Sequence, residues 1–247
     1  MGGYFKILAS ERLKMSRSFI VLLLLLSPAI SVLVGLMSNI EGADRPWLVL
    51  LGTMGMLHAL LFLPILSGIF AAFICRYEHN GGGWKQLLVL PVTRTGVYFA
   101  KYTVVMVMLA IIQLLFLGAM LLVGTVKGID APVDWEIIGR CLAGGWVACL
   151  PLAALQLAVS LMWSSFAAPL ALNVVFTIPN MLVVNSAQFG PYYPWAQPFI
   201  ATVPGQAMEG GGFGAMNLPF ENLMITVLGS FVVFLIFGWT YFKMKEI

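Results

Sequence analysis

The sequence predicts an all-α integral membrane protein with six transmembrane helices, preceded by an N-terminal amphipathic helix at the membrane interface. Of the 247 residues, 61% are hydrophobic and 9% are charged, and the mean hydropathy is +0.98. Soluble domains carry about 25% charged residues, so this composition excludes that class. The apolar runs reach the roughly 20 residues that a spanning helix needs, and they lack the alternation of barrel strands.

A single transmembrane domain accounts for the whole chain. We expect an interfacial helix at residues 3–18 and spans at about 19–37, 48–75, 97–124, 138–162, 168–186 and 223–241. The second span is long enough to tilt, or to kink at Pro64. No Asp, Glu, Lys or Arg occurs between Arg140 and Glu209. This stretch is too long for one crossing, so we divide it at residues 163–169.

The first helix should have an apolar side and a basic side. On a helical wheel, Tyr4, Leu8 and Met15 share one side with Ile7 nearby, and the polar set gathers elsewhere: Lys6, Ser10, Lys14 and Arg17. Glu11 and Arg12 interrupt the pattern. This arrangement favours a helix lying in the inner interface against anionic lipid, and a purely cytosolic helix is the alternative.

Basic residues predict the orientation, because cytoplasmic segments collect Lys and Arg. Three of the 13 Lys and Arg residues, Arg45, Lys127 and Arg140, fall on one side, and the others lie near the chain ends or around residues 76–101. The chain is therefore expected to be a multi-pass membrane protein with both termini cytoplasmic. The net charge of +3 reflects this topology, and no nucleic-acid partner is expected.

The sequence offers little material for catalysis. Gly81, Gly82 and Gly83 precede Trp84 and Lys85 without the spacing or hydroxyl of a phosphate-binding loop. The two histidines form no metalloprotease motif, and the three cysteines are odd in number, which argues against a disulfide framework. We expect no catalytic residue, no metal site and no cofactor in this chain.

Among the polar residues inside the predicted spans, we select five as candidates: His58, Gln113, Gln156, Asn173 and Asn180. Polar groups in lipid are costly unless they have partners, so they could line a transport path. They could equally hold helices together by hydrogen bonds.

A polar segment at residues 76–96 separates the second and third spans. Its three glycines should bend the chain, and Pro91 should end the short helix that follows. In that helix Trp84, Leu87 and Leu88 have the i, i+3, i+4 spacing of one face. An apolar face at the cytoplasmic mouth either lies on lipid headgroups or docks into a partner.

This segment resembles the cytoplasmic loop between spans two and three of ABC-2 type transporter permeases, which have the type V exporter architecture. The resemblance is carried by Glu78, the glycine-rich bend, the Leu-rich helix, the run "LPVTR" and Lys101. The opening "SERLKMSRSFIVLLLLLSPAI", residues 10–30, is similar to the bacitracin and lantibiotic immunity branch of that family.

The resemblance implies a permease subunit whose ATP and Mg are bound by a separate ABC ATPase, present in two copies. It further implies a second permease copy, identical or homologous, contact with membrane lipid, and a location in the bacterial cytoplasmic membrane. Carried over to this sequence, residues 76–96 form the coupling loop. The residues assigned to its bend, docking face and end are Glu78, Gly81, Gly82, Gly83, Trp84, Leu87, Leu88 and Pro91.

Cargo is expected to be amphipathic, because the predicted spans contain almost no charge. The family likeness favours export of, or self-immunity to, a peptide antibiotic or bacteriocin-like peptide. The alternatives are heme- or copper-related or lipid-like cargo, an ATP-independent channel or scaffold, and an intramembrane enzyme. The aromatic, Pro-rich segment at residues 187–222 is expected outside, either re-entering the membrane to meet the substrate or forming an interfacial belt.

Overall fold

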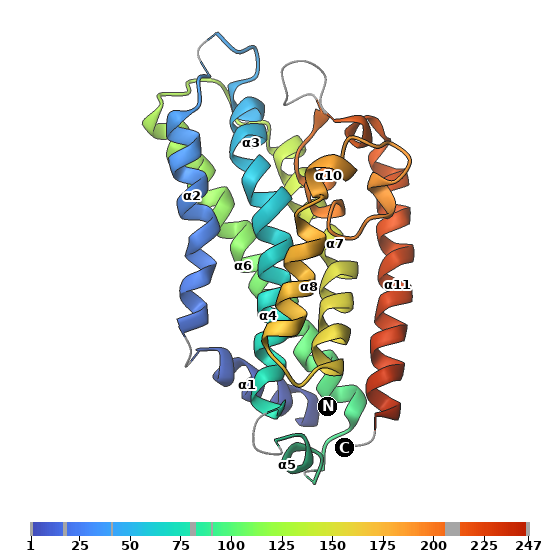
Figure 1. Ribbon diagram of the computed structural model, residues 1–247. Coiled ribbons are helices and arrows are strands. Elements are labelled where there is room, and N and C mark those ends of the chain that lie inside the picture. The colour runs from blue at the N-terminus through green and yellow to red at the C-terminus, as the bar shows by residue number, and fades with distance from the viewer. Residues whose placement is uncertain are drawn as a thin grey trace.

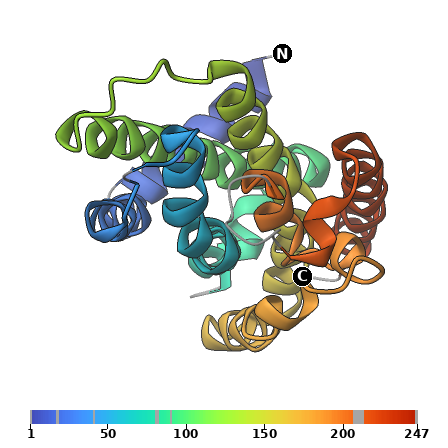
Figure 2. The same ribbon diagram turned by 90° about the horizontal axis from the view of Figure 1, so that it is seen from above.

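The structure, a computed structural model, describes residues 2–16, 19–40, 42–79, 83–89, 91–205 and 213–245. Helices dominate these residues, and no strand occurs among them. By length and composition, four helical stretches could cross a membrane: Pro46–His79, α6 (Arg94–Val126), α7 (Trp135–Met162) and α11 (Phe220–Met244). They form an elongated bundle (Figures 1 and 2). The predicted all-helical membrane fold is confirmed.

Two of the predicted spans are shorter than a full crossing. The first is α2 (Leu23–Met37), which follows a 3-10 turn at Phe19–Leu22. The fifth is divided between α8 (Ala167–Thr177) and α9 (Asn180–Val183), with Pro179 between them. Both are apolar and lie where the sequence places them, but the count of six spans stays a prediction.

The second span contains a local change of helix type. It runs without a break through α3 (Pro46–Leu57), a π-helical turn η2 (His58–Phe62) and α4 (Leu63–His79). Pro64 has no N–H group, so it cannot donate to the carbonyl of Leu60 one turn earlier. Asn180 donates its Nδ2 hydrogen to that carbonyl instead, at 2.9 Å. The irregularity expected at Pro64 is thus a π-helical turn just before it.

Part of residues 187–222 folds back into the bundle. The short helix α10 (Gln197–Thr202) has all six residues buried and packs against α7 and η2 (Figure 1). The 3-10 turns η3 (Gly190–Tyr192) and η5 (Gly214–Asn217) lie beside it. This arrangement is what a re-entrant segment would require, although its depth in a membrane stays a prediction.

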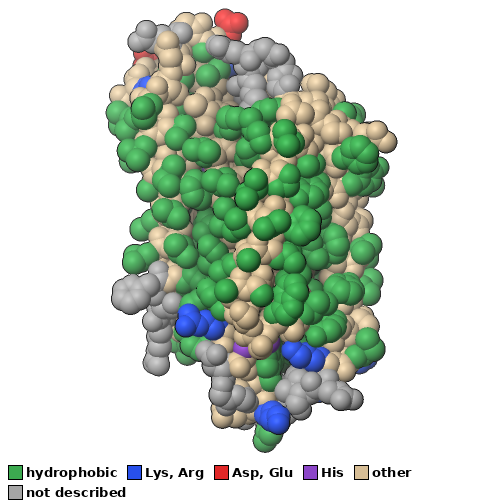
Figure 3. Space-filling view, in the orientation of Figure 1, with side chains coloured by type: hydrophobic (Ala, Val, Ile, Leu, Met, Phe, Trp, Pro, Cys, Tyr) green, Lys and Arg blue, Asp and Glu red, His purple; other side chains and the backbone are tan. Residues whose placement is uncertain are grey.

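Both described chain ends lie at the same end of the bundle, here called the terminal end, together with α1 (Gly2–Ser16) and α5 (Gly83–Val89) (Figure 1). The opposite end is called the far end. On the face shown in Figure 3, the middle of the bundle is largely hydrophobic, and most visible Lys and Arg side chains gather at the terminal end.

Candidate functional site

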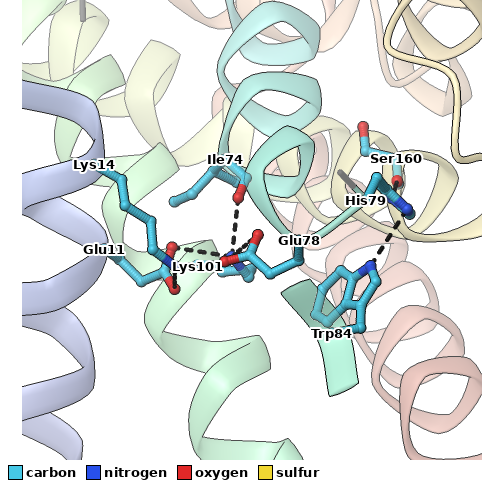
Figure 4. A network of polar contacts seen from close by, with 8 residues as sticks. All are labelled: Glu11, Lys14, Ile74, Glu78, His79, Trp84, Lys101 and Ser160. Atoms are coloured by element: carbon cyan, nitrogen blue, oxygen red, sulfur yellow. Dashed lines mark hydrogen bonds and ion pairs between the residues drawn. The ribbon is translucent and has the colours of Figure 1, made fainter. Parts of the chain in front are cut away.

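Four charged side chains meet at the terminal end and form a cluster that we call the charge quartet. Glu11 and Lys14 come from α1, Glu78 from the last turn of α4, and Lys101 from the second turn of α6 (Figure 4). Glu11, Glu78 and Lys101 are at most 3% exposed, and Lys14 is 23% exposed. Charged groups are almost never this buried unless they are paired.

Each charge in the quartet has partners of opposite sign. The Nζ of Lys101 lies 2.9 Å from Oε2 of Glu11 and 2.9 Å from Oε2 of Glu78, and it also donates to the carbonyl of Ile74 at 2.9 Å. Lys14 pairs with Oε1 of Glu11 at 2.9 Å and with Glu78. Two ammonium groups and two carboxylates make the cluster neutral, so it links three helices without an uncompensated buried charge.

The quartet explains the charged residue that interrupts the amphipathic pattern of α1. Tyr4, Ile7, Leu8 and Met15 pack against the bundle, as the predicted apolar side requires, and Glu11 lies among them at 1% exposed. On a helical wheel this carboxylate interrupts the apolar side, whereas in the fold it forms an ion pair with Lys101. That α1 lies in a membrane interface stays a prediction.

Trp84 anchors the short helix α5 to the bundle. Its ring is 6% exposed, packs 5.2 Å from the ring of Phe242, and lies 5.6 Å from the ammonium of Lys101. Its indole N–H donates to Nδ1 of His79 at 3.3 Å, and Nε2 of His79 contacts the carbonyl of Ser160 at 2.8 Å. The Trp84 side chain therefore connects α5 with α4, α6 and α11, and His79 extends this connection to α7.

These contacts correct the expected exposure of the docking face. Trp84 and the half-buried Leu87 turn inward because they complete the apolar packing at the terminal end. Among the described side chains of α5, the exposed ones are Lys85, Gln86 and Val89, the last at 85%.

The bend before α5 is only partly described. Gly81, Gly82 and the side chain of Leu88 lie outside the described residues. At Gly83 an added Cβ would lie 2.8 Å from the Cα of Glu78, so this close turn excludes any larger residue. The helix ends at Val89, two residues before Pro91, as predicted.

At the terminal end, cationic side chains also donate hydrogen bonds to backbone carbonyls at the C-termini of helices. Arg94 donates to the carbonyl of Lys243 at 3.1 Å, in the last turn of α11, and to the carbonyl of Lys245 at 2.5 Å, just past its end. The ammonium of Lys245 donates to the carbonyl of Leu161 at 2.6 Å, in the last turn of α7, and partial burial lowers the pKa of Lys245. Positive groups are favourable at helix C-termini, and here they join α6, α11 and α7.

His58 and Gln113 form a polar group deep in the bundle. Nδ1 of His58 lies 2.7 Å from Oγ of Ser27, and Nε2 lies 3.1 Å from Oε1 of Gln113. The imidazole is fully buried and stacks on Phe116 at 4.0 Å. Of the two interpretations open from the sequence, this favours a hydrogen-bonded packing residue, although Nε2 of Gln113 lacks a partner among the described residues.

The other three polar residues support the irregular backbone around Pro64. Asn173 donates to the carbonyl of Pro64 at 2.9 Å, and its Oδ1 accepts from Gln156 and from Trp195, both at 2.8 Å. Asn180 donates to the carbonyls of Leu60 and Trp195. These bonds favour a structural role, and a role in a substrate path stays a prediction.

The fold and this site define a polytopic helical membrane protein with a terminal end that is rich in Lys and Arg (Figure 3) and is held together by buried ion pairs. Residues 7–180 match the family described as ABC-2 family transporter protein, and the chain belongs to this family. It is therefore a membrane subunit of a transporter and not itself the ATPase. No curated protein matches the chain. The bacitracin and lantibiotic immunity branch stays a prediction.

Proposed function

We propose that this transporter subunit is the permease of an ATP-driven exporter, and that a separate ABC ATPase docks on the exposed side of α5. The observation that carries the proposal is the burial of Trp84 beside the charge quartet. A short helix that transmits force must be fixed to the helices it moves. Here α5 is fixed through Trp84, and its opposite side remains free for a partner.

The charge quartet gives such a movement a route into the bundle. Glu78 lies five residues before Gly83, the first residue of α5, and it is tied to both α1 and α6. Displacement of α5 would therefore shift α4 together with these two helices. The π-helical turn that precedes α4 is a point where the second span can bend, since such turns interrupt the regular pattern of helical hydrogen bonds.

The ATPase would be present in two copies and would hold ATP and Mg, and a second permease copy, identical or homologous, would complete the transporter. We place the terminal end in the cytoplasm, because most of the Lys and Arg side chains visible in Figure 3 gather there. A reporter fused after Ile247 should then be active only if it is one that works in the cytoplasm.

The cargo we propose is amphipathic, in particular a peptide antibiotic or bacteriocin-like peptide. The described middle of the bundle is apolar or uncharged: Gln156 binds Asn173, and His58 is bound to Ser27 and Gln113. The buried groups there that lack a partner, such as Nε2 of Gln113, are neutral amides or hydroxyls. Among the described residues, the buried charged side chains are Glu11, Glu78 and Lys101 at the terminal end. The described middle of the bundle therefore offers no charge that would bind a small ion. The alternative cargoes are heme-related, copper-related or lipid-like, and export of each would have to be measured with that cargo.

Copurification tests the docking assignment. The tagged protein would be extracted gently from its native membrane as wild type, as Val89→Asp and as Val126→Asp. Val126 is 65% exposed at the far end of α6, so it matches Val89 in type and exposure but lies away from α5. A charge in a desolvated contact should abolish binding, so an ATPase should accompany wild type and Val126→Asp but not Val89→Asp.

Other outcomes would count against the proposal. Equal recovery of the ATPase with both variants would remove the exposed side of α5 from the interface. If no ATPase accompanied the wild type while the protein still exported cargo, an ATP-independent transporter would replace the exporter that we propose.

A further inference from the structure

A cavity of about 850 Å³ opens at the far end, between α7, α10, η5 and α11. Its apolar wall includes Ile200 and Val203 from the α10 segment and Phe220 and Leu223 from α11. This volume lies within the range of roughly 300–1,000 Å³ found for sites that bind drug-sized ligands. None of the residues described above as contacting α5 lines this cavity.

The remaining wall carries a pair of opposite charges. Glu136 and Arg140, on the first turns of α7, both line the cavity, and Nη2 of Arg140 lies 3.1 Å from Oε1 of Glu136. Their side chains are 86% and 55% exposed, so solvent weakens the ion pair and it opens easily. An opened pair offers a guanidinium to an anionic group and a carboxylate to an ammonium group, side by side.

The cavity is closed toward the interior of the bundle by α10. Ile200 and Ala201 face the cavity, whereas the hydroxyl of Thr202 lies close to α7 on the inner side. An added Cβ at Gly145 would lie 2.0 Å from that hydroxyl and 2.9 Å from Nε2 of Gln113. A ligand in the cavity is therefore separated from the His58 and Gln113 group by a single packed helix, and it must enter from the far side.

We infer that this cavity is a binding site for a zwitterionic amphiphile. Its anionic group would bind Arg140, its ammonium group would bind Glu136, and its apolar part would cover Ile200, Phe220 and Leu223. The headgroup of a membrane phospholipid and an exported amphiphile share this chemistry. The inference does not depend on ATPase docking at the other end of the bundle.

Cys141 provides a reporter of occupancy, because it lines the cavity and is 7% exposed, whereas Cys75 and Cys149 are fully buried elsewhere in the bundle. The protein in a nonionic detergent would be treated with N-ethylmaleimide, a small reagent that can enter the cavity. One of three probes would be added: lysophosphatidylethanolamine, which is zwitterionic, lysophosphatidylglycerol, which is anionic, or an uncharged monoacylglycerol. Cys141→Ser gives the background. The zwitterionic probe should slow labelling at the lowest concentration.

Charge variants separate headgroup binding from simple detergency. Arg140→Gln should raise the half-protecting concentration about tenfold for both charged probes, because it removes one charge-assisted hydrogen bond. Glu136→Gln should do so for the zwitterionic probe alone. Asp134→Asn, a nearby acidic residue that does not line the cavity, should change neither value.

Equal protection by the uncharged probe, no effect of Arg140→Gln, or no labelling of Cys141 in the free protein would each overturn the inference. The source of the ligand follows from mass spectrometry after gentle extraction. A zwitterionic phospholipid bound to wild type but not to Arg140→Gln would identify the membrane as the source. Charge-selective protection without any bound lipid would instead support an exported amphiphile.

Discussion

The ammonium group of Lys101 lies 2.9 Å from the carboxylate of Glu11, a residue 90 positions earlier in the chain. Both side chains are 1% exposed. Because the same ammonium also pairs with Glu78, this contact fixes the first helix and the end of α4 to α6 at one point. The geometry of the terminal end thus depends on a few charges, three of which are at most 3% exposed, so that solvent has little access to replace a lost partner.

Replacing Lys101 with Met should strongly destabilise the protein. The change leaves two carboxylates near a single ammonium in a dry site, and breaking a buried ion pair in this way costs about 3–5 kcal/mol. Thermal unfolding of the purified protein in detergent would measure the loss. Glu78→Gln combined with Lys101→Met removes one charge of each sign and keeps the pair of Glu11 and Lys14.

The double variant should therefore lose less stability than the sum of the two single variants. Strict additivity would mean that the two side chains do not act as a pair. Arg140→Gln serves as a surface control, because its ion pair with Glu136 is exposed and contributes about 0–1 kcal/mol.

Changes at Trp84 and Val89 should separate anchoring from docking. Trp84→Ala removes a buried ring and should cost about 3–5 kcal/mol as well as coupling. Val89→Asp alters a side chain that is 85% exposed, so it should reduce cargo-stimulated ATPase activity without lowering the unfolding temperature. A normal unfolding temperature for Trp84→Ala would show that α5 is not anchored by this ring.

Hydropathy was sufficient to predict the four long helical stretches, and the glycines, the apolar spacing and Pro91 were sufficient to predict the short helix α5, because these features depend on local sequence. The inward orientation of Trp84 could not be predicted, since a helix of seven residues has no long-range pattern to show which side faces the bundle. Glu11 posed the same difficulty. Its burial is explained by the ion pair with Lys101, 90 positions later in the chain, and a single sequence contains no signal for that pairing.

The polar residues inside the spans were found from the sequence, but their roles were not. Pro64 predicted an irregular helix, whereas the side chains that satisfy it come from residues more than 100 positions later. The cavity beside α10 gave no sequence signal either, because its walls combine residues from three separate segments.

Asn173→Leu should be far more costly than the same change at Asn185. The Asn173 side chain is fully buried and bonds to Pro64, Gln156 and Trp195, so leucine would leave their polar groups unpaired, at about 1–3 kcal/mol for each group. Asn185 is exposed, and in the described structure its side chain bonds only to the carbonyl of Met181. Equal unfolding temperatures for the two variants would contradict the structural role of Asn173.

Alanine at Gly68 tests the same contact from the opposite side. Gly→Ala within a helix normally adds about 0.5–1 kcal/mol of stability, and Gly118, with nothing within 4 Å of an added Cβ, should show this gain. At Gly68 the new Cβ would lie 2.1 Å from Nδ2 of Asn173, so the amide must move and its bond to Pro64 must weaken. Gly68→Ala should therefore lower the unfolding temperature of the wild type but have a smaller effect in Asn173→Ala, where the clashing amide is absent. If Gly68→Ala were equally harmful in both backgrounds, α4 and α8 would be held together by something other than this asparagine.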